Sequence, residues 1–118
     1  MAQTDFRTAL RGANEITITV TGRKSGRPIS LSVWFVQEVE TLYLLPGKGL
    51  ETNWYKNLRK TPTIRLAAKG KTFTTSATPI TKEELMREVV KKFRDKYSAG
   101  TVNTLYARLD AAIEVPLK

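Results

Sequence analysis

The fold is decided by residues 15–37, which read EITITVTGRKSGRPISLSVWFVQ. In residues 15–21 apolar and polar side chains alternate strictly, a period of two that is typical of a half-buried β-strand. Residues 29–37 alternate in the same way and predict a second strand. Two glycines and a proline within residues 22–28 mark a turn between them. The stretch therefore predicts a hairpin whose turn is rich in basic side chains.

The rest of the chain continues this pattern of short strands interrupted by helices. We expect four further strands, at residues 41–45, 63–68, 71–79 and 111–117. Helices are expected at residues 4–11, at 52–60 capped by Thr52, from a capping box at 81–84 through Tyr97, and in a short stretch ending at Leu105. The longest of these helices has an apolar stripe that includes Leu85, Val89 and Phe93. Short strands at this spacing predict a small, mainly β barrel of the α+β class, forming one domain over residues 1–118.

The composition excludes several kinds of site. The 118 residues contain no cysteine and no histidine. Disulfides are therefore impossible, and neither a transition-metal site nor histidine- or cysteine-based catalysis is expected. No apolar run is long enough for a membrane span, and the N-terminus lacks a signal-peptide pattern, so we expect a cytoplasmic protein. If the protein is an enzyme, a bound cofactor should supply the difficult chemistry.

The charge balance points to anionic partners. Twenty Lys and Arg face eleven Asp and Glu, for a net charge of +9. Such a charge attracts nucleic acid, an anionic membrane surface or an acidic small molecule. Ordinary solubilising surface charge is the alternative.

The turn at residues 22–28 is the first candidate site. Its glycines allow successive backbone N–H groups to converge on an anion. Arg23 offers a planar fork of donors to phosphate oxygens, Lys24 offers a compact charge, and Ser25 adds a hydroxyl. The alternative is a basic turn with solvated side chains.

Two later segments are further candidates. Lys48, in a Pro-Gly-Lys-Gly loop, is a possible second contact to an anion, or part of a plain loop. Trp54 and Tyr55 are neighbours on a short helix, where their directions diverge by about 100°, so we expect only one of them to face the core. The other would line a pocket, within reach of Asn57 one turn later.

Tyr97 and Tyr106 are the candidate catalytic residues. Because the chain lacks histidine, a tyrosine hydroxyl is a candidate proton donor or substrate contact. Ordinary packing is the alternative for both tyrosines.

Three of these segments, in order, resemble the deazaflavin (F420)-dependent nitroreductase family. They are the turn at residues 21–28 followed by Trp34 and Phe35, the strand at 42–45 running into the loop at 46–49, and the segment at 53–58 followed by Pro62. The similarity is strongest over residues 15–68. Members of this family often carry a basic residue directly after the proline of the turn, where this chain has Ile29.

The resemblance implies a fold, a cofactor and a reaction. The fold would be a six-stranded antiparallel split β-barrel of the FMN-binding type, and the cofactor would be F420. The reaction would transfer a hydride from the reduced deazaflavin to a small unsaturated, quinone or nitro acceptor. The implied cofactor-binding residues lie in the turn and in the two later segments. They are Arg23, Lys24, Ser25, Gly26, Arg27, Lys48, Trp54 and Asn57.

Other functions stay open at this point. FMN in the same groove, or a non-catalytic flavin- or F420-binding protein of the same fold, would use the same residues. A protein of another class, a basic β-barrel that binds single-stranded nucleic acid, would use aromatic side chains on strands, such as Trp34, Phe35, Tyr43 and Phe73. The expected partner is a small-molecule substrate and not a nucleic acid, and the chain would be a monomer or a homodimer.

Overall fold

The computed structural model describes residues 6, 8–10, 12–38, 40–98, 100, 102 and 110–117. Phe6, Thr8 and Ala9 are helical, within the first predicted helix. The strands that the structure assigns are β1 (Glu15–Thr21), β2 (Pro28–Glu38), β3 (Thr41–Leu44), β4 (Thr63–Ala68), β5 (Lys71–Ser76), β6 (Thr78–Ile80) and β7 (Ala112–Pro116). The assigned helices are the 3₁₀ turn η1 (Gly49–Glu51), α2 (Asn53–Lys60) and α3 (Glu83–Tyr97).

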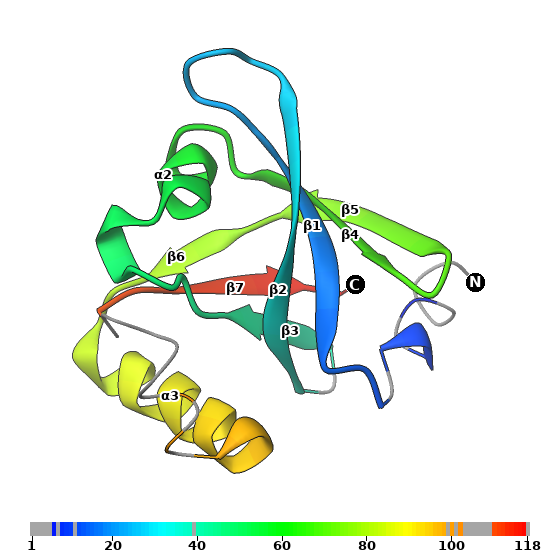
Figure 1. The fold of residues 1–118 in the computed structure, drawn as a ribbon. Coiled ribbons are helices and arrows are strands. Elements are labelled where there is room, and N and C mark those ends of the chain that lie inside the picture. Colours follow the sequence, from blue (N-terminus) through cyan, green and yellow to red (C-terminus); the bar gives the residue numbers. More distant parts are fainter. Residues whose placement is uncertain are drawn as a thin grey trace.

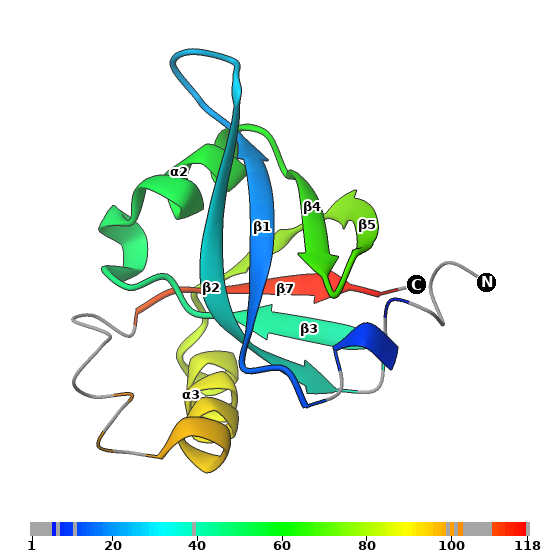
Figure 2. The ribbon, with the colours of Figure 1, turned by 45° about the vertical axis from the view of Figure 1, so that its right-hand side comes forward.

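The strands form one antiparallel sheet in the order β5-β4-β1-β2-β3-β7-β6. The long strand β2 pairs with β1 up to Trp34 and with β3 from Phe35 onward. It therefore belongs to both halves of the sheet, which bends around it (Figures 1 and 2). The strands β5 and β6 end the order without pairing to each other. The predicted α+β split barrel is confirmed.

The described sheet has seven strands instead of the six expected. The single strand predicted at residues 71–79 is divided at Ala77 into β5, which pairs with β4, and β6, which pairs with β7. The N–H of Ala77 donates to the carbonyl of Pro62 at 2.8 Å. The chain therefore leaves one half of the barrel at Ala77 and joins the other, a change of partner that side-chain alternation does not reveal.

The barrel interior is the main core, and α2 covers one side of it. The alternating side chains of β1, Ile16, Ile18 and Val20, are buried as predicted. The expectation that only one aromatic residue of α2 faces the core is wrong, because Tyr55 is 1% exposed and Trp54 is 7% exposed. Since α2 contacts both β1 and β6, core residues meet this short helix on more than one side.

The helix α3 forms a second core on the outer face of the β2, β3 and β7 half. Its buried residues are Met86, Val89, Val90 and Phe93. Leu85, which we placed in the same apolar stripe, is 44% exposed. The residue that caps α3 is Lys82, without a side-chain hydrogen bond, so the predicted capping box does not form. None of the described helices is both long and apolar enough to cross a membrane.

Candidate functional site

The basic turn, residues 22–28, stands out beyond the rest of the sheet and beside α2 (Figures 1 and 2). Two backbone hydrogen bonds close it, from Gly22 N–H to the Arg27 carbonyl and from Gly26 N–H to the Gly22 carbonyl, both 2.9 Å. Gly26 has a φ of +71°, a left-handed conformation that favours glycine. Ser25 Oγ accepts the N–H of Arg27 at 3.2 Å. The turn is therefore internally fixed.

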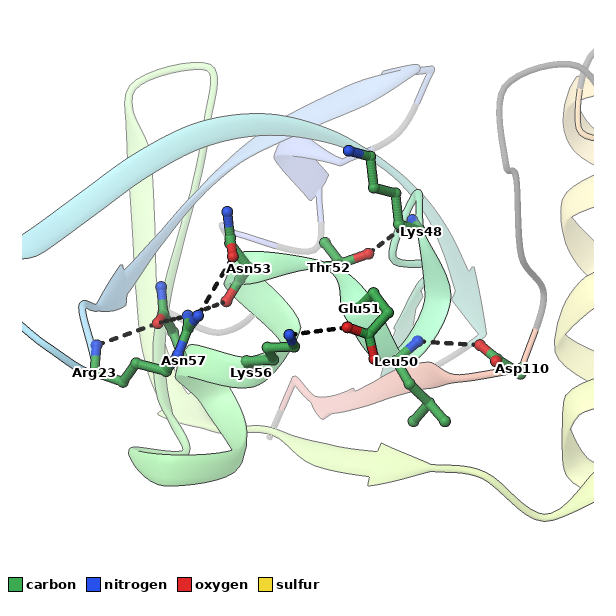
Figure 3. A network of polar contacts seen from close by, with 9 residues as sticks. All are labelled: Arg23, Lys48, Leu50, Glu51, Thr52, Asn53, Lys56, Asn57 and Asp110. Atoms are coloured by element: carbon green, nitrogen blue, oxygen red, sulfur yellow. Dashed lines mark hydrogen bonds and ion pairs between the residues drawn. The ribbon is translucent and has the colours of Figure 1, made fainter.

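Arg23 ties this turn to α2. Oδ1 of Asn57 accepts two hydrogen bonds from Arg23, from its backbone N–H at 3.1 Å and from Nη1 at 2.8 Å. Asn53 lies one helical turn earlier and receives Nη1 at its carbonyl (3.2 Å) and Nη2 at its side-chain oxygen (3.4 Å) (Figure 3). Lys60 Nζ donates to the carbonyl of Arg23 at 2.8 Å. These contacts position a residue 30 or more positions distant from its partners in the sequence.

A cleft of about 290 Å³ lies between the basic turn and α2. It is lined by Gly22, Arg23, Lys24, Ser25, Ile29, Asn53 and Asn57. Among these lining residues there is no carboxylate, and Lys24 is exposed. Two basic side chains therefore face a cleft that has no acidic group to neutralise them. Gly26 and Arg27 belong to the turn but do not line this cleft.

A second cleft, of about 540 Å³, continues from the first between β2 and the segment that leads into α2. It shares Ile29, Asn53 and Asn57 with the first cleft and adds Leu31, Gly47, Lys48, Glu51, Thr52 and Trp54. A third cleft, of about 260 Å³, shares Leu31, Gly47 and Trp54 with the second and reaches Trp34. Because neighbouring clefts share residues, they form one groove, here called the β2–α2 groove. The groove is basic at the turn and most apolar in its middle, and its far end is lined by Trp34 together with Glu15.

The loop before α2 brings Lys48 to this groove. Thr52 is the N-cap residue of α2, as expected, but its side chain makes no hydrogen bond to the helix. Its hydroxyl oxygen instead accepts the N–H of Lys48 at 2.7 Å. Figure 3 shows the Lys48 side chain extending away from this bond, and Glu51 turned toward Lys56, with which it forms an ion pair of 3.1 Å. The carboxylate of Glu51 is thus already balanced.

Tyr97 does not line the described groove. Its hydroxyl lies 2.7 Å from the carbonyl oxygen of Asn14 and 2.8 Å from that of Phe35, and it accepts the Phe35 N–H at 3.2 Å. The pairing of β1 with β2 ends at Glu15 and Trp34. The Tyr97 hydroxyl bridges the next two residues, Asn14 and Phe35, which do not pair with each other. Burial raises the pKa of the Tyr97 phenol to about 12. Held by three backbone groups, this hydroxyl is placed as a structural bridge.

The ring of Tyr97 nevertheless contacts Trp34, a residue that lines the groove. It stacks on Trp34 with a centroid distance of 4.2 Å and an interplanar angle of 10°. Lys96 contacts the neighbouring residue of β2, Phe35. Its Nζ donates to the Phe35 carbonyl at 2.8 Å and lies 3.7 Å from the centroid of the Phe35 ring. Burial lowers the pKa of this lysine. The second predicted tyrosine, Tyr106, lies outside the described residues.

The structure thus brings together six of the residues that the sequence indicated, and it adds others. Arg23, Lys24, Ser25, Lys48, Trp54 and Asn57 all line the β2–α2 groove. Sequence reasoning missed Asn53, although its spacing of four from Asn57 places both amides on one helix face. It also missed the apolar wall formed by Ile29 and Leu31, which the alternation of β2 could have indicated because both residues share one face of that strand.

Comparisons with known proteins agree with this architecture. A solved structure of an F420-H2 dependent reductase, FDR-A, is 23% identical, with a TM-score of 0.67 over 86% of this chain and 93% of that one. A domain-swapped dimer is 20% identical, with a TM-score of 0.68 over 96% of this chain and 94% of that one. HutZ, the heme storage protein from Vibrio cholerae, is 16% identical, with a TM-score of 0.72 over 98% and 89%. At these identities the likeness shows the shared fold alone.

The family is shown by sequence. No curated protein matches the chain. The family model described as F420H(2)-dependent quinone reductase matches residues 2–113, nearly the whole chain. This match confirms the resemblance to F420-dependent reductases and favours F420 over FMN. The chain belongs to the F420H(2)-dependent quinone reductase family and is an F420-dependent reductase.

Proposed function

We propose that the β2–α2 groove binds F420 and that the protein transfers a hydride from the reduced deazaflavin to a small quinone, nitro or other unsaturated acceptor. One observation supports the placement of F420 in this groove. The guanidinium of Arg23 is fixed at the basic end of the groove by uncharged partners, in a cleft with no carboxylate in its lining. A cation that is held in place but not neutralised is suited to bind an anion.

The basic end would hold the phosphodiester of the cofactor. Arg23 and Lys24 provide the charges, and the Ser25 hydroxyl adds a donor beside them. Gly26 and Arg27 would act by shaping the turn, because the Arg27 carbonyl and the Gly26 N–H make the hydrogen bonds that close it.

The middle of the groove would hold the ring system. Leu31 and Trp54 provide apolar surface there, and Lys48 provides one cation at the rim. A mostly apolar wall with a few polar groups is typical of cofactor sites. When bound, reduced F420 supplies the hydride, while the chain's own residues orient it and keep water from the ring.

The acceptor would bind at the Trp34 end, next to the ring. Tyr97 fixes the plane of Trp34 by stacking on it, so its contribution would be to packing and not to proton transfer. Tyr106 stays a predicted proton donor.

The nucleic-acid alternative finds little support among the described strands. Stacking of bases needs aromatic faces open to solvent. Phe35 is buried, Trp34 stacks on Tyr97, and Phe73 stacks on Phe6 with a centroid distance of 5.9 Å. These three rings already have protein partners.

A single-turnover experiment tests the proposed reaction. Reduced F420 bearing hydrogen or deuterium at the transferred position is mixed with excess protein and with a short-chain quinone, a nitroaromatic or an enone. We expect oxidation of the cofactor by at least one acceptor, and slower oxidation of the deuterated form. If none of the acceptors oxidises the bound cofactor, or if deuterium never slows the step, the hydride-transfer proposal is wrong.

A further inference from the structure

We propose that Asn57 is a positioning residue that acts through Arg23, as an uncharged clamp that fixes the guanidinium and leaves its charge available to phosphate. This inference rests on the proposed function, because it concerns the basic end of the same groove. It adds a role to the one that the sequence suggested, in which Asn57 contacts the cofactor directly.

The geometry of Asn57 carries the first step. The residue is 4% exposed and is the one buried polar residue of the described chain. Its side-chain oxygen accepts two hydrogen bonds from Arg23, one from the backbone and one from the guanidinium. It thereby fixes both the start of the basic turn and the direction of the side chain. An oxygen used twice in this way is occupied by Arg23 and not free for a ligand.

The chemistry of the clamp carries the second step. A guanidinium is usually held most strongly by a carboxylate, through charge-assisted hydrogen bonds. Arg23 is instead held by two amides and a backbone carbonyl, from Asn53 and Asn57. A carboxylate would give the same geometry but would compete with phosphate for the cation. The choice of amide over acid therefore keeps the site cationic.

If Asn57 acts as a clamp, substitutions affect the order of the turn and the affinity for F420 differently. A purely structural role would lower both together. Asn57→Asp has the same shape and should hold the turn at least as firmly as the native residue, but it should neutralise Arg23. Asn57→Ala should release the turn while leaving the charge of Arg23 intact. The order of the turn should therefore fall only in Asn57→Ala, whereas the larger loss of cofactor affinity should occur in Asn57→Asp.

The test measures F420 affinity by fluorescence titration and the order of the turn by hydrogen exchange of its amides, for each variant. Gln37→Glu is the matched control, because it makes the same change of amide to carboxylate on β2 outside the groove. We expect Asn57→Asp to bind F420 at least about tenfold more weakly, with native exchange at the turn, and Gln37→Glu to bind like the native protein. Asn57→Ala should bind with an intermediate affinity.

A second variant keeps the test decisive if Asn57→Asp does not fold. Asn53 is exposed and its side-chain oxygen lies 3.4 Å from Arg23 Nη2, so Asn53→Asp places a carboxylate near the same cation without disturbing the core. It should weaken F420 binding in the same direction. Binding within about twofold of native in both Asp variants would overturn the clamp. Native affinity in Arg23→Ala would instead show that F420 binds elsewhere, which would overturn the proposed site.

Discussion

Arg23 and Tyr97 show how the groups that hold a polar side chain determine what that side chain can still bind. Arg23 is positioned by uncharged groups, which leave its charge for a ligand. Tyr97 is positioned by the carbonyl groups of Asn14 and Phe35 and by the N–H of Phe35, which use its hydroxyl fully. The same kind of local observation therefore supports our proposal that Arg23 binds a ligand and that Tyr97 contributes to packing.

Replacement of Tyr97 by Phe should alter stability in a pH-dependent way. The folded pKa of about 12 lies above the unfolded value of about 10, so the folded state retains the phenolic proton more strongly. The resulting stability is complete below pH 10 and is lost as the pH rises through 12. Tyr97→Phe should remove this part of the decline, and at neutral pH it should cost about 1–3 kcal/mol because backbone groups lose their partner.

Urea denaturation at several pH values between 8 and 12 checks this prediction. Tyr43 and Tyr55, whose pKa values are raised by burial, are present in both proteins, so the difference between them isolates Tyr97. Equal slopes of unfolding free energy against pH would show that the hydroxyl is not held as described.

At the scale of elements, the basic turn and α2 form one unit. Arg23 joins them through Asn53 and Asn57, and Lys60 adds a bond from the end of the helix. The short loop before α2 is fixed separately, through Thr52 and Lys48. The groove between β2 and α2 therefore has two independent supports, and each can be removed by a single substitution.

The two glycines of the basic turn should differ in their effect on binding. A Cβ at Gly22 would lie 2.7 Å from Ser25 Oγ and 3.1 Å from Ile29 Cδ1, so Gly22→Ala must displace residues that line the groove. A Cβ at Gly26 meets no atom within 4 Å, and Gly26→Ala costs only the strain of a positive φ, about 1–2 kcal/mol. We expect a clear loss of F420 affinity in Gly22→Ala and a smaller one in Gly26→Ala. Fluorescence titration measures both, and the reverse order would contradict the described turn.

Thr52→Ala should loosen the Lys48 loop. The Lys48 N–H loses an acceptor at 2.7 Å, at a cost of about 1 kcal/mol. Hydrogen exchange at Lys48 should become faster and F420 binding modestly weaker. Thr52→Ser retains the hydroxyl and is the control. Unchanged exchange in Thr52→Ala would show that the bond does not order the loop.

At the scale of the whole molecule, the packing of α3 against the sheet makes the residues of this helix unequal in their contribution to stability. Phe93 is fully buried in the outer core, whereas Leu85 on the same helix is 44% exposed. Phe93→Ala should therefore lower the free energy of unfolding by about 3–5 kcal/mol, and Leu85→Ala by at most about 1 kcal/mol. Urea denaturation gives both values. Similar losses for the two variants would contradict the packing of α3 against the sheet.

Much of this architecture could be predicted because its signals are local. The alternation in residues 15–21 gives β1 with its bounds and its buried face, and the glycines and proline of residues 22–28 indicate the turn that follows it. The division of the strand at Ala77 could not be predicted, because only the pairing of β5 with β4 and of β6 with β7 separates its two parts. The periodicity of side chains within one strand does not indicate which other strand pairs with it.

The candidate site was predictable to the same extent. The residue types that attract phosphate are visible in residues 22–28, but their fixation depends on Asn53 and Asn57, which are distant in sequence. For Tyr97, the absence of histidine made a catalytic hydroxyl reasonable. Only the tertiary structure shows that β1 ends where this hydroxyl bridges the backbone.

The central claim is that Arg23 and Lys24 at the end of the β2–α2 groove bind F420, and a paired titration tests it most directly. The double variant Arg23→Ala with Lys24→Ala is compared with Lys71→Ala with Lys91→Ala, which removes the same charge from exposed positions on β5 and α3. Circular dichroism confirms that both are folded. We predict that the first variant binds F420 at least about a hundredfold more weakly than the native protein, and that the second binds within about threefold. Equal affinities in the two double variants would contradict the claim.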